Sequence, residues 1–312
     1  MEVQKNIIFD TDPGIDDVIA ITALTHLFCA QTKLFVSTFG NVSGETTHRN
    51  LKNLLALLGT DTPILRGSIC ALNTPLSGDA KSADHFHGQN GLGGITLPQT
   101  AQANDISSEQ PFEDTLYQTI LQHAPITYIA VGPLTNLARL IMKYPDSKKY
   151  ITQVYCMGGG LNLHNSPGKS EFNFHADPAA AQAVIQSGLD IRLFPLDTTH
   201  EVIFSDLEIA QITGVRREET LDESNRRRLI AAIFYASFDA GMRYQEGGAV
   251  MHDLMPVASL ANGITSIQEA ISITVNTDGR TKKTADGNIV QLVKGFNKKQ
   301  IAALLQDIFA AL

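Results

Sequence analysis

The sequence predicts an α/β protein with a mainly parallel central sheet flanked by helices, an open sheet of the Rossmann type, in a single domain over residues 1–312. Two observations lead to this prediction. Short strand-like runs alternate with helical stretches through the first two-thirds of the sequence, and such alternation favours parallel strands covered by helices on both faces. No internal repeat, low-complexity tract or linker interrupts the chain, which favours one domain.

Local patterns predict the individual elements in order. Strands are expected at Asn6–Asp10, Lys33–Phe39, Ile126–Val131, Ile151–Met157 and Ile191–Leu196, and late strands at Ser266–Val275 and Asn288–Val293, which the polar stretch Asn276–Gly287 joins. Helices are expected at Asp16–Cys29, Thr135–Lys143, Asp222–Arg243, Asp253–Ala261 and Lys298–Phe309. Two more helices follow from Leu51, Leu54, Leu55 and Leu58, which share one helix face, and from Asp177-Pro178, an N-cap followed by proline at the first helical position.

Composition excludes several classes of protein. The 24 basic and 32 acidic residues give a net charge of −8, which disfavours binding to nucleic acid. No apolar run reaches the roughly 20 residues that span a bilayer, so no membrane association is expected. Three scattered cysteines indicate neither a disulfide framework nor a cysteine zinc cluster. Because the N-terminal segment also lacks the pattern of a signal peptide, we expect a cytoplasmic protein.

Polar or glycine-containing positions follow the predicted parallel strands, namely Asp10, Gly40-Asn41, Val131-Gly132, Met157-Gly158 and Asp197. In an open α/β sheet, ligands bind beyond the carboxyl ends of the strands. These positions, far apart in the sequence, are therefore expected to converge on one rim of the sheet.

Four carboxylates lie within the eight residues from Asp10 to Asp17, directly after the first strand. The turn at Pro13-Gly14 brings Asp16 and Asp17 back towards Asp10 and Asp12. Negative charges this close repel one another unless a cation neutralises them, and carboxylate oxygens suit calcium or magnesium better than zinc. The alternative is that Asp16 and Asp17 only stabilise the N-terminus of the next helix, which leaves the other two aspartates unexplained.

This segment resembles the signature DxDPGxDD of the inosine–uridine-preferring nucleoside hydrolases and matches it in full. The resemblance implies that Asp12 is the general base that takes a proton from the attacking water and that it also touches a bound calcium ion. It further implies that Asp17 binds calcium, that Asp16 holds the ribose hydroxyls and that Asp10 supports the site. Calcium in such a site can hold water and lower its pKa.

Later segments match the same family in the same order. The resemblance places Asn41 at the active site, although a Gly-Asn pair after a strand is by itself a turn signal. The segment from Val131 to Asn136, VGPLTN, resembles the one that gives calcium a backbone carbonyl, here that of Val131, and Thr135-Asn136 is expected to cap the next helix. The pattern N-x5-E-F-N implies that the ribose hydroxyls are held by Asn165, Glu171 and Asn173.

Two histidines are candidates for protonation of the leaving base. Met251-His252-Asp253 resembles the family segment in which a histidine, here His252, protonates the base and an aspartate, here Asp253, binds calcium. His87 lies in a second matching segment, with His85 as a weaker candidate, inside the polar stretch Thr74–Ala103 that we expect to form a lid. The aromatic residues Tyr244 and Phe238 can stack on a base.

The resemblance as a whole implies a calcium-dependent hydrolase that cleaves the N-glycosidic bond of ribonucleosides to ribose and free base, in nucleoside salvage. It implies a homodimer or homotetramer and leaves the preferred base open. Two alternatives remain. A phosphatase of the haloacid-dehalogenase type would use Asp10 and Asp12, although Gly14 stands where such enzymes have threonine or valine. A catalytically inactive, metal-stabilised ligand-binding protein would keep the same residues without turnover.

Overall fold

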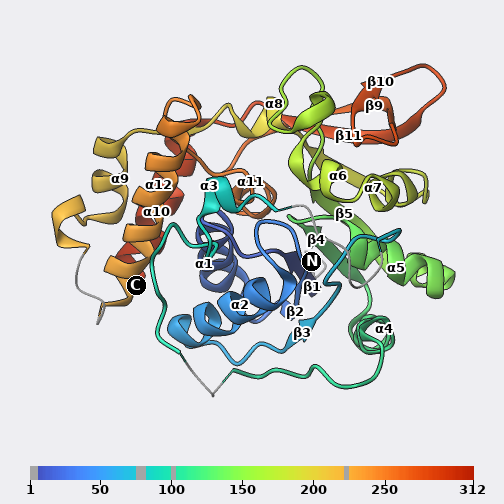
Figure 1. Ribbon diagram of the computed structural model, residues 1–312, viewed down its shortest axis with the longest axis horizontal. Helices are drawn as coiled ribbons and strands as arrows, with labels where there is room; N and C mark the ends of the chain where they lie inside the picture. Colours follow the sequence, from blue (N-terminus) through green and yellow to red (C-terminus); the bar gives the residue numbers. More distant parts are fainter. Residues whose placement is uncertain (1–5, 75–81, 100–102, 221–224) are drawn as a thin grey trace.

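A large, mostly parallel sheet forms the centre of the molecule (Figure 1). The computed structural model describes residues 6–74, 82–99, 103–220 and 225–312. The strands of this sheet are β1 (Asn6–Thr11), β2 (Thr32–Ser37), β3 (Ile64–Arg66), β4 (Ile126–Ala130), β5 (Ile151–Met157), β6 (Ile191–Phe194), β9 (Ile267–Val275), β10 (Thr281–Lys283) and β11 (Asn288–Lys294). A separate antiparallel pair is formed by β7 (Ile203–Phe204) and β8 (Ala249–Val250).

The strand order explains where a ligand can bind. The nine strands are ordered β10-β9-β11-β6-β5-β4-β1-β2-β3. All neighbours from β3 to β6 are parallel, and so is the pair β6–β11, whereas β9 is antiparallel to both β11 and β10. The part β3-β2-β1-β4-β5-β6 has the order of the Rossmann fold, whose ligands bind at the switch point between β1 and β4. The prediction of an open Rossmann-type sheet is confirmed.

Alternating side chains of the strands supply a core on each face of the sheet. On β1, Ile7 and Phe9 belong to one buried apolar cluster and Ile8 belongs to the other. On β2, Phe35 points to the first cluster and Val36 to the second. Because these five side chains are buried, each contributes roughly 1.5–3 kcal/mol to the free energy of folding, and together they fix the register of β1 and β2.

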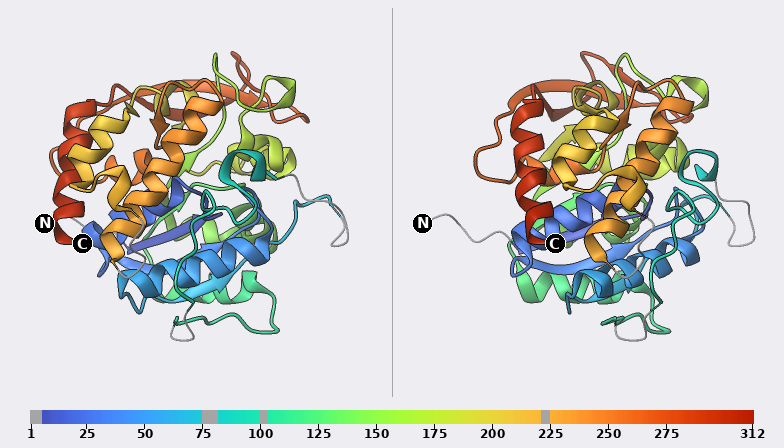
Figure 2. Two further views of the ribbon diagram at one scale, coloured as in Figure 1. Left: turned by 60° about the vertical axis from the view of Figure 1, so that its left-hand side comes forward. Right: turned by 90° about the vertical axis from the view of Figure 1, so that its left-hand side faces the viewer.

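Helices cover both faces. The first cluster contains side chains of α1 (Asp17–Phe28), α2 (Gly44–Leu58), α9 (Asp206–Thr213), α10 (Arg226–Arg243), α11 (Leu254–Ala258) and α12 (Lys298–Ala311). The second contains side chains of α4 (Phe112–His123), α5 (Thr135–Lys143), α6 (Phe172–Ala176) and α7 (Pro178–Ile185). Figure 1 shows α9, α10 and α12 on one side of the molecule and α5, α6 and α7 on the other, and in both views of Figure 2 the first three stand side by side. The short helices α3 (Asp84–His87) and α8 (Leu196–Thr199) lie near the carboxyl ends of the strands.

Several predicted elements differ from the structure. The described part of the predicted helix Asp222–Arg243 begins at Arg226, after the N-cap Asn225, while residues 222–224 lie outside the described residues. The predicted helix Asp253–Ala261 ends at Ala258. The polar stretch Asn276–Gly287 contains the strand β10, and the stretch Thr74–Ala103, of which 75–81 and 100–102 are not described, contains the helix α3. Both elements are too short and polar for a periodicity signal.

Within the described ranges, no helix combines the length and the apolar character needed to cross a membrane.

Candidate active site

A cavity of about 440 Å³ lies at the carboxyl ends of the central strands. Its lining comes from the turn after β1, the loop after β2, the residue after β4, the loop after β5 and the segments around α3 and α11. The predicted convergence on one rim is therefore observed for the strand ends at Asn41, Val131 and Met157. It brings together most of the residues that the sequence singled out, namely Asp16, Asn41, His85, His87, Val131, Asn165, Glu171, Asn173, Tyr244, His252 and Asp253. Two predicted strand-end residues, Asp10 and Asp197, do not line the cavity. The carboxylate of Asp197 accepts hydrogen bonds from the main-chain N–H groups of Leu161 (2.7 Å) and Asn162 (2.9 Å).

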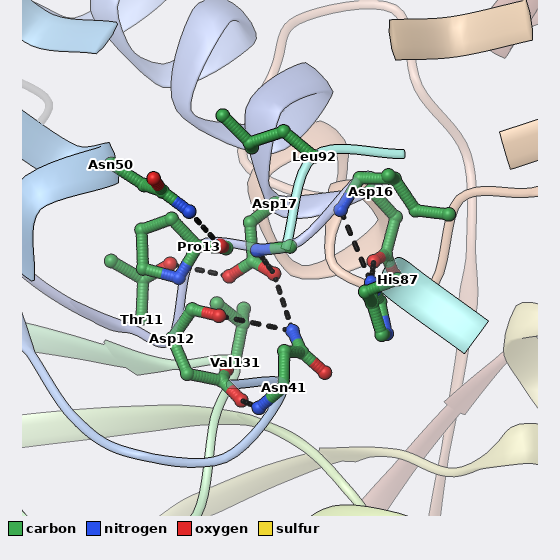
Figure 3. Close-up of polar contacts among 12 residues, drawn as sticks. Thr11, Asp12, Pro13, Asp16, Asp17, Asn41, Asn50, His87, Leu92 and Val131 are labelled. Atoms are coloured by element: carbon green, nitrogen blue, oxygen red, sulfur yellow. Dashed lines mark hydrogen bonds and ion pairs between the residues drawn. The ribbon is translucent and has the colours of Figure 1, made fainter. Parts of the chain in front are cut away.

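The turn after β1 is held by hydrogen bonds to its own carboxylates (Figure 3). The hydroxyl of Thr11 donates to Asp17 Oδ1, and the main-chain N–H of Gly14 donates to Asp17 Oδ2 at 2.8 Å. Asn41 Nδ2 donates to the same Oδ2 at 3.0 Å. Asp17 is fully buried, so these donors replace the water that a carboxylate requires.

Asp12 is buried beside the cavity residue Asn41, with one carboxylate oxygen bound and one free. The main-chain N–H of Asn41 donates to Asp12 Oδ2 at 2.8 Å, whereas Oδ1 is buried and has no partner among the described residues. The approach is close, since a Cβ atom at Gly40 would lie 2.0 Å from Oδ2 and one at Gly132 would lie 2.5 Å from Oδ1. The chain therefore keeps glycine on both sides of a carboxylate whose remaining oxygen has no protein donor.

Three other carboxylates gather beside it. Asp16, Asp17 and Asp253 each offer one oxygen, and these oxygens lie within 4.8 Å of one another. Burial, and then the charge of Asp17, raise the pKa of Asp16 to about 8, and burial raises the pKa of both Asp12 and Asp253 well above the ordinary value. Buried negative charges at this range favour a cation of charge two or more between them, and an all-oxygen donor set fits a hard cation. The residues thus fit a metal ion of the calcium or magnesium type.

Asp10 is not in the cavity and supports it from within the sheet. Tyr128 OH donates to Asp10 Oδ2 at 2.7 Å, and Asn136 Nδ2 donates to Oδ1 at 2.9 Å. Burial raises the pKa of Asp10 to about 7. Asn136 also accepts from the main-chain N–H of Ser68 at 2.7 Å, so it ties β1 to the neighbouring loop.

The prediction that Thr135-Asn136 caps the following helix is wrong. Leu134 occupies the N-cap position of α5, and both polar side chains point into the protein. Thr135 Oγ1 donates to Asp177 Oδ2 at 2.7 Å, and Asn136 binds Asp10. Local sequence suggested a cap because threonine and asparagine commonly cap helices, but long-range buried partners compete for both side chains.

The loop after β5 presents Asn165, Glu171 and Asn173, which differ in how free they are. Asn165 is exposed at the rim. Glu171 is the N-cap of α6 and accepts from the main-chain N–H groups of Gly159, Asn173 and Phe174 at 2.7–3.1 Å, while burial raises its pKa to about 7. Asn173 Nδ2 donates to the carbonyl oxygen of Val131 at 2.7 Å. Glu171 and Asn173 therefore stabilise the loop as well as lining the cavity.

The two candidate histidines have different neighbours. His252 Nδ1 lies 2.7 Å from Thr199 Oγ1, and its ring lies 5.1 Å from that of His200. His87 Nδ1 accepts from the main-chain N–H of Ile15 at 3.2 Å, and burial lowers the pKa of His87 to about 3. His87 is therefore neutral at physiological pH, with one ring nitrogen already occupied (Figure 3). Burial also lowers the pKa of His252.

Of the two candidate aromatic residues, only Tyr244 lines the cavity. Its hydroxyl donates to the carbonyl oxygen of His85 at 2.8 Å, and its ring lies 5.3 Å from that of Phe86. Phe238 was a wrong candidate, because it packs against the core and its ring is covered by the guanidinium of Arg217 at 5.6 Å.

The cavity residues that the sequence analysis missed include His200 and Glu246. His200 follows α8, and its position just beyond the predicted strand end at Asp197 was an available signal. Glu246 is two residues beyond Tyr244, in the loop after α10. Burial raises the pKa of Glu246 to about 7, and its Oε2 atom is buried and has no partner among the described residues.

Comparison with known proteins identifies the family of this chain. The family model described as inosine-uridine preferring nucleoside hydrolase matches residues 7–306. A non-specific ribonucleoside hydrolase RihC from Escherichia coli is 32% identical over 274 residues, which cover 88% of this chain and 84% of the relative. The RihC protein from Shigella flexneri is 31% identical over the same shares of both chains.

Solved structures show the same fold. A plant nucleoside hydrolase, PpNRh1, is 23% identical, has a TM-score of 0.85 and matches 99% of this chain and 100% of its own. A purine-preferring ribonucleoside hydrolase from Gardnerella vaginalis is 22% identical with a TM-score of 0.84 and the same coverage. Since the family model and the RihC relatives span most of the chain, the protein belongs to the family of inosine-uridine preferring nucleoside hydrolases, as the signature from Asp10 to Asp17 indicated.

Proposed function

We propose that this protein is a calcium-dependent, cytoplasmic hydrolase that cleaves the N-glycosidic bond of ribonucleosides to ribose and free base in nucleoside salvage. The observation that supports this most is the single cavity in which the carboxylate cluster, amide and carboxylate groups suited to a sugar, and two histidines meet. Family membership favours this function over the phosphatase alternative. The RihC relatives are non-specific ribonucleoside hydrolases by name, which supports activity on more than one base.

The metal-binding proposal rests on the oxygen atoms beside Asp12. Asp12, Asp17, Asp253 and the carbonyl oxygen of Val131 are the proposed ligands of calcium. The free Oδ1 of Asp12 and the mutual proximity of the other carboxylates support this choice. The Val131 carbonyl already accepts from Asn173, but a carbonyl oxygen has two lone pairs and can bind a cation with the second. When bound, calcium would supply positive charge that stabilises a deprotonated water and the ribose diol.

Asp12 is the proposed general base. Its Oδ1 has no protein donor, and an ionised carboxylate oxygen has two acceptor sites, so one can face the cation and the other can accept a proton from water. Burial raises its pKa, which increases its proton affinity. The hydrogen bond from Asn41 to Oδ2 and the two flanking glycines fix the direction of Oδ1, so the base needs little reorganisation during the reaction.

Ribose binding is assigned to side chains that surround the acidic cluster, namely Asp16, Asn41, Asn165, Glu171 and Asn173. The Nδ2 group of Asn41 donates to the main-chain carbonyl oxygen of Asp12 and to Asp17 Oδ2, which leaves Asn41 Oδ1 as an acceptor for a sugar hydroxyl. Glu171 and Asp16 can accept further hydrogen bonds, since an ionised carboxylate has about four acceptor sites. A site built from such groups discriminates against a sugar that lacks a hydroxyl.

The base is assigned to the part of the cavity near Tyr244, His87 and His252. We favour His252 as the proton donor to the leaving base over His87, because the segment Met251-His252-Asp253 matches the family segment whose histidine has this role. Tyr244 offers an aromatic face at the rim of the cavity.

The test is a panel of natural ribonucleosides in which released ribose is measured with calcium, with magnesium and after chelation. We expect ribose release with calcium and its loss after chelation. Absence of release from every nucleoside would favour the alternative of a ligand-binding protein.

We further propose that residues 1–312 form one domain that assembles into a homodimer or homotetramer. Light scattering of the purified chain would check this oligomeric state.

A further inference from the structure

A second group of metal-ligating side chains faces the same cavity and is distinct in chemistry from the aspartates. His200, Glu246 and His252 each offer one ligand atom, and these three atoms lie within 4.8 Å of one another. The residues come from the end of α8, the loop after α10 and the segment before α11. Only His252 has a place in the proposed hydrolysis, so the other two side chains need a separate explanation.

Hydrogen bonds fix the orientation of both imidazole rings. A carbonyl oxygen can only accept, so His200 Nδ1, 3.1 Å from the carbonyl oxygen of Leu196, carries the proton and Nε2 keeps its lone pair. The hydroxyl of Thr199 donates to the same carbonyl at 3.4 Å and lies 2.7 Å from His252 Nδ1. With the hydroxyl hydrogen of Thr199 on Leu196, its oxygen accepts from Nδ1–H of His252, and in this tautomer the Nε2 atom of the ring keeps a lone pair for a metal. Such bonds to the second nitrogen are typical of metal-binding histidines.

Glu246 completes the group with a carboxylate, one oxygen of which has no hydrogen-bond partner among the described residues. Its Oε2 atom is buried and unpartnered, although its main-chain N–H donates to the carbonyl oxygen of Gly241 at 2.7 Å and so anchors the loop. The preceding residue, Gln245, has a φ of 64°, a conformation uncommon for a residue with a side chain. The chain thus uses a strained turn to hold an unpaired carboxylate against two imidazoles.

We propose that His200, Glu246 and His252 form a site for a divalent transition metal ion of the zinc type. Two imidazole nitrogens and one carboxylate oxygen are a donor set that zinc and its neighbours bind with a fourth position left open. Calcium prefers an all-oxygen set, which the aspartates supply. The two sites in one cavity therefore select different metals.

An effect on catalysis follows, and this part rests on the proposed function. A metal bound to Nε2 of His252 would occupy the nitrogen that has to take up a proton before it can give one to the leaving base. We therefore expect zinc to inhibit hydrolysis of nucleosides while calcium remains bound at the aspartates.

The test uses cobalt(II) as a spectroscopic probe on the full chain, saturated beforehand with calcium so that the aspartate cluster is filled. We expect a visible absorption band from one cobalt ion per chain, lost when zinc, which has no such band, displaces it. His200→Asn keeps a donor for Leu196 and Glu246→Gln keeps the shape of the side chain, yet each removes a ligand. Each should weaken cobalt binding by at least about 10–100-fold, more than loss of an outer hydrogen bond does.

The matched control is His164→Asn, which changes an exposed histidine that lines the same cavity outside the group. It should bind cobalt like the parent protein. No band in the parent protein, an unchanged band in both ligand variants, or loss of the band as calcium is raised would each overturn the proposal. The spectrum does not depend on turnover, so cobalt binding without nucleoside hydrolysis would refute the proposed function alone, and hydrolysis without cobalt binding would refute this site alone.

Discussion

The close approach of the buried carboxylates of Asp16, Asp17 and Asp253 predicts how the stability of the metal-free protein depends on their charge. Asp16→Asn removes one negative charge from the cluster and keeps the size of the side chain. In protein from which metal has been removed, we expect this substitution to stabilise the fold, although it changes a residue of the proposed active site. The gain should grow with pH, because the ionised form of Asp16 is the one that the folded protein disfavours.

The direction follows from proton linkage. The pKa of Asp16 rises from 3.8 in the unfolded chain to about 8 in the folded protein, through burial and then through the charge of Asp17. The folded state therefore holds a proton that the unfolded chain releases. The contribution of Asp16 to stability is fully present below pH 3.8 and is lost as the pH rises through about 8.

The size follows from the same shift. Each unit of pKa shift corresponds to about 1.4 kcal/mol, so a group that titrated alone with this shift would lose on the order of 5 kcal/mol by about pH 8. Asp16 shares its proton affinity with Asp17 and Asp253, so replacing one of the three recovers only part of this loss. We expect Asp16→Asn to gain ~2–3 kcal/mol between about pH 5 and pH 8.

Urea unfolding followed by far-ultraviolet circular dichroism measures this gain, since the chain has no tryptophan for fluorescence. Asp61→Asn is the control, because Asp61 is exposed and lies outside the cluster. Added calcium should abolish the pH-dependent gain, since the ion supplies the missing positive charge. The reasoning would be refuted if the gain in the free energy of unfolding were the same at both pH values, or if the control variant reproduced it. Either result would show that the buried carboxylates do not repel one another enough to destabilise the fold.

Four further outcomes are expected. Asp12→Asn should lower kcat by about 10²–10⁴-fold, as loss of a general base does, with unchanged circular dichroism; near-normal kcat would remove Asp12 from this role. Deoxyuridine should have a kcat/KM at least roughly 10-fold below that of uridine, because buried partners of the missing hydroxyl stay unpaired; equal values would contradict the ribose assignment. His252→Ala should slow nucleosides by about 10²–10⁴-fold and leave p-nitrophenyl riboside nearly unaffected, since that leaving group needs no proton; equal losses would point to a positioning role. Asn136→Ala should lower the free energy of unfolding by ~3 kcal/mol, because Asp10 and the main-chain N–H of Ser68 both lose a buried partner; a change below about 1 kcal/mol would contradict this.

The sequence predicted the parallel core and the meeting of its strand ends for a physical reason. Parallel strands buried on both faces read as short apolar runs, and their carboxyl ends reach the same edge of the sheet. Asp12 and Val131 follow neighbouring strands, β1 and β4, so a motif at each strand end was enough to bring them together. The outer strand β10 was missed because it has only three residues, two of them exposed lysines.

Hydrogen bonds between buried side chains that are far apart in the sequence could not be predicted from the sequence. Thr135 and Asn136 carry the composition of a helix cap, and nothing local distinguishes a cap from a pair of residues that bind buried aspartates. In the structure, Thr135 and Asn136 of α5 donate hydrogen bonds to the carboxylates of Asp177 and Asp10. Buried carboxylates require such donors in place of water. The same holds for Glu171, whose assignment to ribose did not reveal that it also caps α6.

The two donor sets in the cavity affect how metal dependence has to be measured. Chelation removes a metal from the aspartates and from the group of His200, Glu246 and His252 at once. If calcium supports turnover and a transition metal at the histidines blocks it, chelation would lower activity through the first site and raise it through the second. The net effect would then depend on trace metal in the preparation. Activity therefore has to be compared at fixed calcium with and without added zinc, in the parent chain and in Glu246→Gln. Only that comparison separates a requirement for calcium from relief of inhibition.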